Sequence, residues 1–264
     1  MIKGLIVYNQ IDQKKNEWFI KECLNRLNDE YFSLFYKEEN DVLSYLKENI
    51  VDFVIYRARN SSLLKELENK GIKCFNNSLT NEIANDKYAT YLLCKENSIN
   101  CLETFLNEPK DLAFPYIMKS INGHGGQEVF LINSEKDRLN ILKKFQNNFI
   151  YQRYLRDCDD IRLYVLNNQV VGAVKRNNAL DYRSNYSLGG SVSKYEPSKE
   201  MVETALRISR LLKATYIGVD FLIDKGTCYL NEIEDPVGAR MLYKTSNIDI
   251  INLFIKEIKN QFFQ

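Results

Sequence analysis

The chain of 264 residues carries 36 Lys and Arg against 35 Asp and Glu, and 45% of its residues are hydrophobic. This near-neutral balance excludes a bulk electrostatic argument for nucleic acid or a membrane surface as partner. No apolar run approaches the length of a membrane span, and the length suits one globular protein with several lobes.

The cysteines show neither a CxxC pair nor the spacing of a zinc site: Cys23, Cys74, Cys94, Cys101, Cys158 and Cys228. Most lie in apolar stretches, where a reduced thiol packs as a small hydrophobic group. The apolar run at the N-terminus is too short for a signal peptide. We therefore expect a protein of the reducing cytoplasm.

Strands and helices alternate over roughly residues 1–80. Continuous apolar runs predict strands at Leu5–Tyr8, Phe53–Tyr56 and Ile72–Phe75. Amphipathic periodicity predicts the helices of this part, which are Asn16–Leu27, Asp41–Glu48 and Ser62–Asn69. Such alternation is typical of a small parallel sheet.

The rest of the chain mixes helices with strands that follow one another directly. Helices are predicted at Asn81–Glu96, Glu135–Phe145 and Lys199–Lys213, and a last helix opens with Ser246 and Asp249 in capping-box spacing. The predicted strands are Tyr116–Lys119, Glu128–Ile132, Phe149–Gln152, Arg162–Leu166, Val170–Lys175, Tyr216–Ile223 and Thr227–Ile233. This pattern indicates antiparallel sheets.

The stretch Tyr216–Pro236 concentrates carboxylates on a predicted hairpin with a Lys-Gly turn. Glu232 and Glu234 fall on the same face of its second strand, and Asp220 lies in the middle of the first. Carboxylates that converge from adjacent strands suit Mg²⁺, which shares its ligand shell with nucleotide phosphates. The alternative is an edge hairpin with solvent-facing acids.

A loop with Gly123, Gly125 and Gly126 joins two predicted strands. Glycine lets the backbone approach a ligand, and successive N–H groups form an anion-binding nest. Lys119, at the end of the preceding strand, would reach the same anion. The loop is not a Walker A motif, because no Lys-Ser/Thr pair follows the glycines. The alternative is a flexible hairpin that binds no ligand. For His124, a mobile loop histidine is favoured over a catalytic base.

Arginines and an acid follow in the next strands. Residues 151–162 read as strand, short polar loop and strand, and strand-end backbone groups of this kind can pair with an adenine edge. Asp160 and Arg162 lie on the same side of the new strand, and Arg176 and Arg183 come later. Guanidinium groups make bidentate contacts with phosphate or carboxylate. For any single arginine, a solvated basic loop is the alternative.

In this order the segments resemble the ATP-grasp superfamily and, within it, the RimK-like carboxylate-amine ligases. The most specific string is DIR at 160–162, a strand that ends in Arg176, DYRSN at 181–185, GVD at 218–220 and NEIE at 231–234. The resemblance, over roughly residues 50–264, implies an α/β protein that is α+β in its C-terminal part. A small parallel-sheet domain (1–85) would precede two subdomains that clamp a nucleotide, 86–150 with the glycine-rich loop and 151–264 with the metal site.

The resemblance also implies roles for matching positions. Lys87 and Lys119 would hold phosphates, and Arg162 and Arg176 would act with Lys119 on the transferred phosphoryl group. The other nucleotide contacts would be Gly123, Gly125, Gly126, Gln152, Arg153, Tyr154, Leu155, Asp160, Arg183, Ser184 and Asn185. Asp220, Glu232 and Glu234 would bind the metal, although the family usually has asparagine at the last of these positions.

The implied activity is ATP-dependent ligation of a carboxylate to an amine through an acyl-phosphate, with Mg²⁺ as cofactor and Mn²⁺ as a substitute. The substrate would be an amino acid, a short peptide or the peptide tail of a partner protein, with Arg57, Arg59 and Arg240 as candidate carboxylate contacts. No nucleic acid or membrane partner is expected, and the sequence is compatible with a homo-oligomer. The alternatives are an ATP-grasp phosphotransferase and a nucleotide-binding regulator without turnover.

Overall fold

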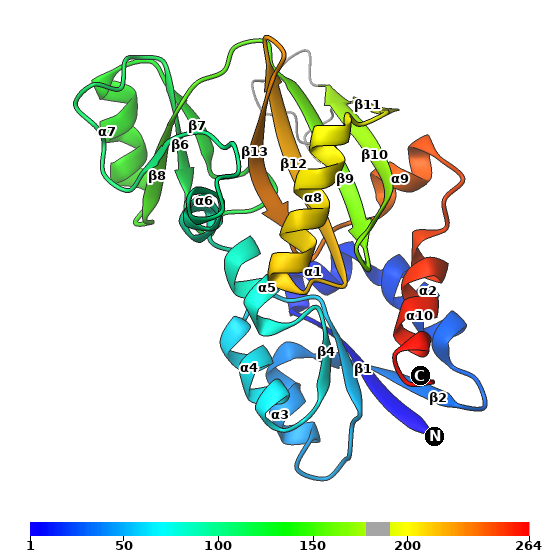
Figure 1. Ribbon diagram of the computed structural model, residues 1–264. Helices are drawn as coiled ribbons and strands as arrows, with labels where there is room; N and C mark the ends of the chain where they lie inside the picture. Colours follow the sequence, from blue (N-terminus) through cyan, green and yellow to red (C-terminus); the bar gives the residue numbers. More distant parts are fainter. Residues whose placement is uncertain (178–190, 264) are drawn as a thin grey trace.

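A four-stranded parallel sheet in the order β2-β1-β3-β4 lies at the bottom of Figure 1, and we call this sheet with its helices the first domain. The computed structural model describes residues 1–177 and 191–263 of the chain. The strands are β1 (Ile2–Tyr8), β2 (Phe32–Glu38), β3 (Phe53–Tyr56) and β4 (Lys73–Phe75). The predicted parallel sheet is confirmed. Sequence reasoning misses β2, because charged residues close its short apolar run.

Short helices connect and cover these strands. They are α1 (Gln10–Lys15), α2 (Glu17–Leu27), α3 (Val42–Tyr45), α4 (Ser61–Asn69) and α5 (Ser78–Ala84), with a 3-10 turn at η1 (Glu39–Asp41). Helix α1 is absent from the prediction, because its polar sequence has no apolar face. Helix α3 ends before the predicted Glu48.

The second sheet is antiparallel and lies at the upper left of Figure 1, in the order β5-β8-β6-β7. Its elements are α6 (Lys87–Glu96), β5 (Thr104–Phe105), β6 (Tyr116–Ser120), β7 (Val129–Ile132), α7 (Glu135–Lys144) and β8 (Phe149–Arg153). The single predicted helix Asn81–Glu96 is wrong. The chain breaks at Asp86, whose side chain accepts from two backbone N–H groups of α6 at 2.8 Å and so starts a new helix.

The third sheet has five antiparallel strands in the order β11-β10-β9-β12-β13. Its elements are β9 (Asp159–Leu166), β10 (Gln169–Asn177), β11 (Ser191–Lys194), α8 (Lys199–Leu212), β12 (Tyr216–Asp224), β13 (Thr227–Glu234), α9 (Arg240–Thr245) and α10 (Ile250–Asn260). The predicted capping box at the last helix is wrong, because Asp249 itself caps α10 and Ser246 ends α9.

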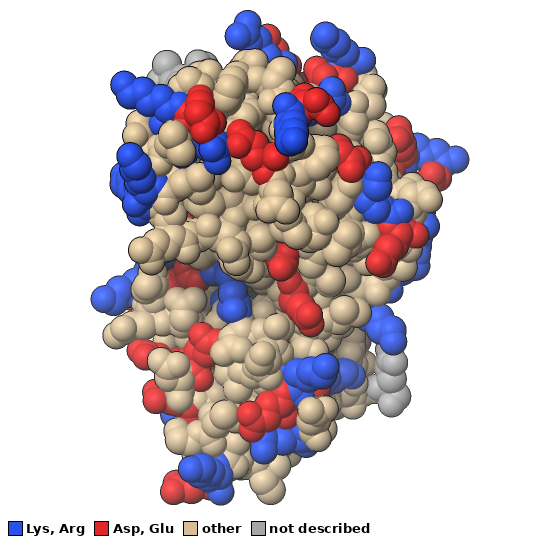
Figure 2. Space-filling model, turned by 90° about the vertical axis from the view of Figure 1, so that its left-hand side faces the viewer, with Lys and Arg blue, Asp and Glu red and all other residues tan. Residues whose placement is uncertain are grey.

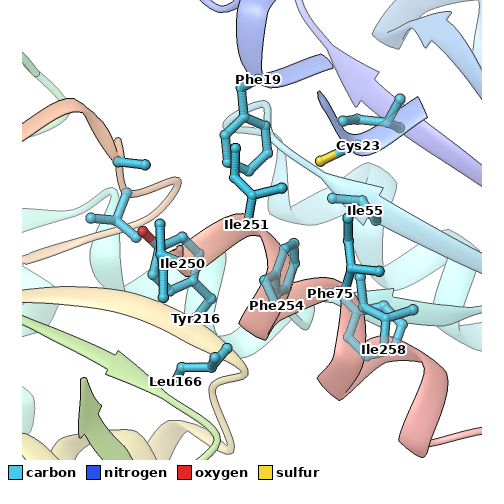
Figure 3. Close-up of a cluster of buried hydrophobic side chains, with 14 of the residues drawn as sticks. Phe19, Cys23, Ile55, Phe75, Leu166, Tyr216, Ile250, Ile251, Phe254 and Ile258 are labelled. Carbon is cyan, nitrogen blue, oxygen red and sulfur yellow. The ribbon is translucent and has the colours of Figure 1, made fainter. Parts of the chain in front are cut away.

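Helix α10 joins the first domain to the third sheet. One hydrophobic cluster contains Phe254 and Ile258 of α10, Phe19 and Cys23 of α2, and Tyr216 of β12 (Figure 3). Because the end of the chain packs against its beginning, the two parts share a core. The predicted domain boundaries at residues 85 and 150 stay a prediction. Within the described residues, no helix is both long and apolar enough to cross a membrane.

Candidate active site

A cavity of about 540 Å³ is lined by residues of the second and third sheets and of the first domain. This volume lies in the range of small-molecule binding sites. Figure 2 shows a hollow at mid-height on one face, with basic and acidic side chains inside it. The second sheet contributes β6 and β8, the third sheet contributes β9, β10 and β13, and the first domain contributes α1 and the loop after β3.

Two buried arginines and two buried aspartates form a hydrogen-bonded cluster across β9, β10 and β12. Nε and Nη2 of Arg162 donate to the two carboxylate oxygens of Asp220, both at 2.7 Å. Nη2 of Arg176 donates to Asp160 at 2.5 Å and to Asp220 at 2.7 Å. Strand pairing explains the assembly, since Arg162 lies opposite Asp220 and Arg176 lies opposite Asp160. These four buried groups carry equal numbers of opposite charges, and Nη2 of Arg162 also donates to the half-buried Glu234 at 2.6 Å.

The cluster shifts the pKa values of its two acids in opposite directions. Burial alone would raise the pKa of Asp220, but the charges of Arg162 and Arg176 lower it below its ordinary value. For Asp160, burial outweighs the nearby Arg176 and raises the pKa. Asp220 therefore stays ionised because two guanidinium groups bind it.

The two lysines that the sequence singles out both line the cavity. Nζ of Lys119 donates to Oδ1 of Asn231 at 3.0 Å and lies 3.8 Å from a carboxylate oxygen of Glu232. Burial lowers the pKa of Lys119, and the charge of Glu232 opposes this in part. Lys87 donates to the backbone carbonyl of Gly123, so this lysine already touches the glycine loop.

The loop and the hinge face the same cavity. The predicted glycines and the four predicted hinge residues all line it, namely Gly123, Gly125, Gly126, Gln152, Arg153, Tyr154 and Leu155. Gly125 and Gly126 have φ of 66° and 73°, a backbone conformation that favours glycine. Nε2 of Gln152 donates to Thr104, but its buried Oε1 has no partner among the described residues. An outside donor would satisfy that oxygen.

The three predicted metal ligands are not equally available. Glu232 lines the cavity and forms no hydrogen bond or ion pair with an arginine among the described residues. Glu234 also lines it, but its Oε2 accepts from Nη2 of Arg162 at 2.6 Å, and Asp220 is 1% exposed with both oxygens accepting from arginine. Within the described ranges, no group of three His, Cys, Asp or Glu side chains is placed to hold a metal ion. The oxygen donors of Glu232, Glu234 and Asn231 suit Mg²⁺ in their chemistry. Asp220 joins them only if an arginine contact rearranges, so the three-carboxylate site stays a prediction.

Arg183, Ser184 and Asn185 lie outside the described residues. Arg57 does not line the cavity: it is buried and donates to the carbonyl of Val237 at 2.6 Å, so its role as a carboxylate contact is not supported. Arg59 and Arg240 do line the cavity.

The sequence interpretation also misses the contribution of α1, which brings Asp12 and Lys15 to the cavity. The signal that identifies this helix is Asn9, a residue type favoured at helix N-caps. Its side chain accepts from the backbone N–H of Asp12, three positions on.

Comparison with known proteins identifies the fold and the family. Residues 69–258 match the model of the RimK-like ATP-grasp domain. Protein MG011 of Mycoplasma genitalium is 30% identical over 273 residues, which covers 98% of this chain and 93% of the relative. A probable alpha-L-glutamate ligase of Haemophilus influenzae is 26% identical over 250 residues, with 86% and 84% covered.

Two solved structures have the same fold at low sequence identity. D-alanine–D-alanine ligase from Bacillus anthracis, complexed with ATP, superposes with a TM-score of 0.74 at 14% identity and 99% coverage of both chains. The ATP-grasp ligase PsnB, complexed with a phosphomimetic variant of its minimal precursor, Mg and ADP, gives 0.74 at 14% identity and 98% coverage of both chains. The predicted α/β ATP-grasp fold is therefore confirmed over almost the whole chain. Because the family model covers most of the sequence, the chain belongs to the RimK-like ATP-grasp family and is an ATP-dependent carboxylate-amine ligase.

Proposed function

We propose that the protein activates a carboxylate with ATP as an acyl-phosphate and then transfers the acyl group to an amine, on an amino acid, a short peptide or a peptide tail. The observation that carries the proposal is the meeting of Arg162, Arg176 and Lys119 in one cavity with Lys87 and the glycine loop. The names of the relatives support both substrate classes, since one is a probable glutamate ligase and PsnB is complexed with a precursor.

ATP would bind with its base at the hinge and its phosphates at the lysines. The unpartnered Oε1 of Gln152 is an acceptor that suits the exocyclic amino group of adenine. Lys87 and Lys119 would contact the phosphates, and the backbone N–H groups of the glycine loop would close over them. We also assign Arg183, Ser184 and Asn185 to this nucleotide site, as the sequence motif predicts.

Mg²⁺, or Mn²⁺ in its place, would be held by Glu232 and by the oxygen of Glu234 that Arg162 does not bind, with Asp220 joining once its arginine contacts rearrange. When bound, the ion would neutralise phosphate charge and orient the terminal phosphoryl group. The presence of Mg with ADP in the PsnB complex supports Mg²⁺ as the cofactor.

In the first step, a carboxylate oxygen of the substrate attacks the γ-phosphorus of ATP, and the bond to the bridging oxygen of ADP breaks. Arg162, Arg176 and Lys119 would offset the repulsion between the two anions and stabilise the charge that develops on the phosphoryl oxygens. To do this, the arginines exchange part of their contact with Asp220 and Asp160 for substrate oxygens.

In the second step, the amine nitrogen attacks the acyl carbon, the carbon–oxygen bond to phosphate breaks, and the nitrogen loses a proton. The same cationic groups would hold the oxyanion of the tetrahedral intermediate. Both steps proceed without a side chain as covalent nucleophile. Positioning of the reactants alone can lower the activation barrier by about 7–11 kcal/mol in favourable cases. Closure of the glycine loop would keep water away from the acyl-phosphate.

The proposal is tested by ADP release from Mg·ATP with pooled amino acids and dipeptides, followed by mass spectrometry of the products. We expect ADP together with a product that is lighter than its two components by one water. Arg176→Lys should lower this turnover, because lysine cannot replace the fork of two donors. Arg207→Lys is the matched control, since Arg207 is exposed and does not line the cavity.

A phosphate ester in place of an amide would indicate a phosphotransferase. Binding of Mg·ATP without ADP release from any pool, and with no turnover of longer peptides, would contradict the ligation chemistry and support the regulatory alternative.

A further inference from the structure

The first-domain side of the cavity has its own set of charged groups, separate from the arginine–aspartate cluster. Asp12 and Lys15 come from α1, Arg59 comes from the loop after β3, and Arg240 comes from the start of α9. None of these residues contacts Asp160, Asp220 or Glu232 through a hydrogen bond or ion pair in the described part of the chain. This side of the cavity therefore forms a second binding region next to the proposed nucleotide site.

Asp12 is held in place with one oxygen unused. Its Oδ2 accepts from Nδ2 of Asn9 at 2.9 Å and from Nη1 of Arg59 at 2.5 Å, and its backbone N–H donates to Oδ1 of Asn9 at 2.8 Å. Asp12 is 9% exposed, yet its Oδ1 makes no hydrogen bond or ion pair with any described residue. A fixed carboxylate oxygen beside a cavity is a good acceptor for a cationic group of a ligand.

The charge of Asp12 is secure at neutral pH. Burial would raise the pKa of its carboxyl, but the hydrogen bond from Asn9 and the charge of Arg59 bring the pKa below its ordinary value. Arg59 and Asn9 both donate to the same oxygen of Asp12, Oδ2. The unused oxygen therefore keeps its capacity to accept.

Two cations near Asp12 have no acidic partner. Arg240 donates to the backbone carbonyl of Lys15, and neither residue forms an ion pair with an acid in residues 1–177 or 191–263. Both are exposed at the edge of the cavity. A ligand that carries both an ammonium group and a carboxylate would be complementary to this side of the cavity, with the ammonium at Asp12 and the carboxylate at Arg240 and Lys15.

We propose that Asp12 binds the ammonium group of a substrate through its free Oδ1 and thereby selects substrates with an unmodified amino group. Arg59 and Asn9 are positioning residues that hold the Asp12 carboxylate, and Arg240 and Lys15 meet the carboxylate of the same ligand. The inference rests on the proposed function, since it assigns one substrate of the ligation to the first-domain side of the cavity.

The test is a binding experiment that needs no turnover. The protein, saturated with Mg²⁺ and a non-hydrolysable ATP analogue, is titrated with each free amino acid and with its N-acetyl derivative, which lacks the ammonium group. We expect the wild-type protein to bind at least one free amino acid about 10- to 100-fold more tightly than its N-acetyl form, which is the range for a hydrogen bond to a charged group. Asp12→Asn should reduce this ratio to about threefold or less.

Glu17→Gln is the matched control, because it removes an exposed carboxylate five positions away that does not line the cavity. If Asp12→Asn does not fold, Arg59→Gln provides the second variant. It keeps the charge of Asp12 but removes the hydrogen bond that fixes the carboxylate, so discrimination should fall. Arg59→Lys should recover part of the discrimination. Equal binding of free and N-acetyl amino acids by the wild-type protein overturns the inference, and so does full discrimination in Asp12→Asn.

The binding experiment and the turnover experiment separate the two proposals. Amide formation that is equally efficient in Asp12→Asn and wild type at low amino acid concentration overturns the role of Asp12 and leaves the ligation intact. Discrimination that depends on Asp12, in a protein that forms no amide from any pool, supports the ammonium site and contradicts the proposed reaction.

Discussion

Two buried polar clusters lie at the strands β12 and β13, and they satisfy their carboxylates in different ways. In the cavity, Asp220 is bound by two arginines, so that charge meets charge. At the joint between the first domain and the third sheet, Asp235 is bound by neutral amides: Asn76 donates to its Oδ1 at 2.8 Å and Asn81 donates to its Oδ2 at 2.9 Å. The first cluster contains cations that a substrate anion can use, and the second does not.

The pKa shifts follow the same division. Two guanidinium groups overcome burial at Asp220 and lower its pKa, whereas at Asp235 burial outweighs the two amides and raises the pKa. The arginines that hold Asp220 have further donors that a substrate anion can use, but full removal of both arginines would leave a buried charge unpaired. A carboxylate held by fixed amides is part of the structure itself. We therefore expect changes in the cavity to affect the reaction first and changes at the joint to affect stability first.

The largest effect is expected at the rim of the cavity cluster. Glu232→Gln keeps the size of the side chain but removes the charge that would bind Mg²⁺, and ADP release should be abolished. Glu234→Asn introduces the residue that the family usually has at this position, and a measurable fraction of activity should remain. Both are measured as ADP release at saturating Mg·ATP. Wild-type-like activity of Glu232→Gln contradicts the metal assignment, and complete loss in Glu234→Asn gives the third carboxylate a required role.

Arg162→Met should reduce both activity and stability. It removes donors to the developing phosphoryl charge, and the loss of a single such donor lowers kcat by about 10²–10³-fold. It also leaves Asp220 with one arginine in place of two, and breaking a buried ion pair costs about 3–5 kcal/mol of unfolding free energy. Turnover assays and urea unfolding measure the two effects.

The double variant Arg162→Met with Asp220→Asn separates these effects. It removes the uncompensated charge, so stability should partly recover, while turnover stays low because the arginine and a proposed metal ligand are both gone. If turnover recovers together with stability, the arginine is structural and the comparison between the two clusters fails.

Asp235→Asn should affect stability more than turnover. The new amide group faces an amide donor of Asn76 or Asn81, so one buried donor loses its acceptor. This should cost about 1–3 kcal/mol in urea unfolding, and kcat should fall by less than about tenfold. Adding Asn81→Asp exchanges donor and acceptor across the same contact, but it removes the donor of Asn81 to the carbonyl of Ala58 at 3.0 Å, so only part of the stability should recover. A wild-type unfolding midpoint for Asp235→Asn would show that the joint does not depend on this carboxylate.

The same contrast explains what the sequence can predict. Asp160, Arg162 and Asp220 are found from the sequence because side chains alternate along each strand, and adjacent strands bring like-facing residues together. The pairing of Asn76 with Asp235 joins positions 159 residues apart in different domains, and no local period reports it. Sequence reasoning misses Asp12 for the same reason, because its place in the cavity depends on how the first domain packs against the other two sheets.

Local errors have local causes. The break between α5 and α6 follows from the capping of α6 by Asp86, which competes with an otherwise continuous helical pattern. The availability of Asp220 for a metal cannot be derived from the GVD motif, because the motif specifies the face of the strand and not the arginine contacts of its carboxylate. Topology and motif positions are thus predictable, whereas contacts between domains and the pairing of buried charges are not.

The smallest effect is expected in the pH dependence, and it concerns Lys119, which we propose as a phosphate contact. Burial lowers the pKa of Lys119 below its ordinary value of 10.5, and the charge of Glu232 only partly opposes this. As the pH rises through this lowered pKa, Lys119 loses its charge earlier than an exposed lysine would, so phosphate binding weakens. The value of kcat/KM for ATP, which reports the free enzyme, should therefore fall on the alkaline side.

Lys119→Arg tests the cause, because a guanidinium group stays charged throughout this range. Its alkaline limb should move to higher pH or disappear, even if the activity at neutral pH is lower. The comparison is made in profiles of kcat/KM for ATP between about pH 7 and pH 10, with kcat measured alongside. At saturating ATP the phosphates stabilise the ammonium form, so kcat should change less with pH. An alkaline limb that is identical in Lys119→Arg and wild type would assign the titration to another group and remove Lys119 from the nucleotide site.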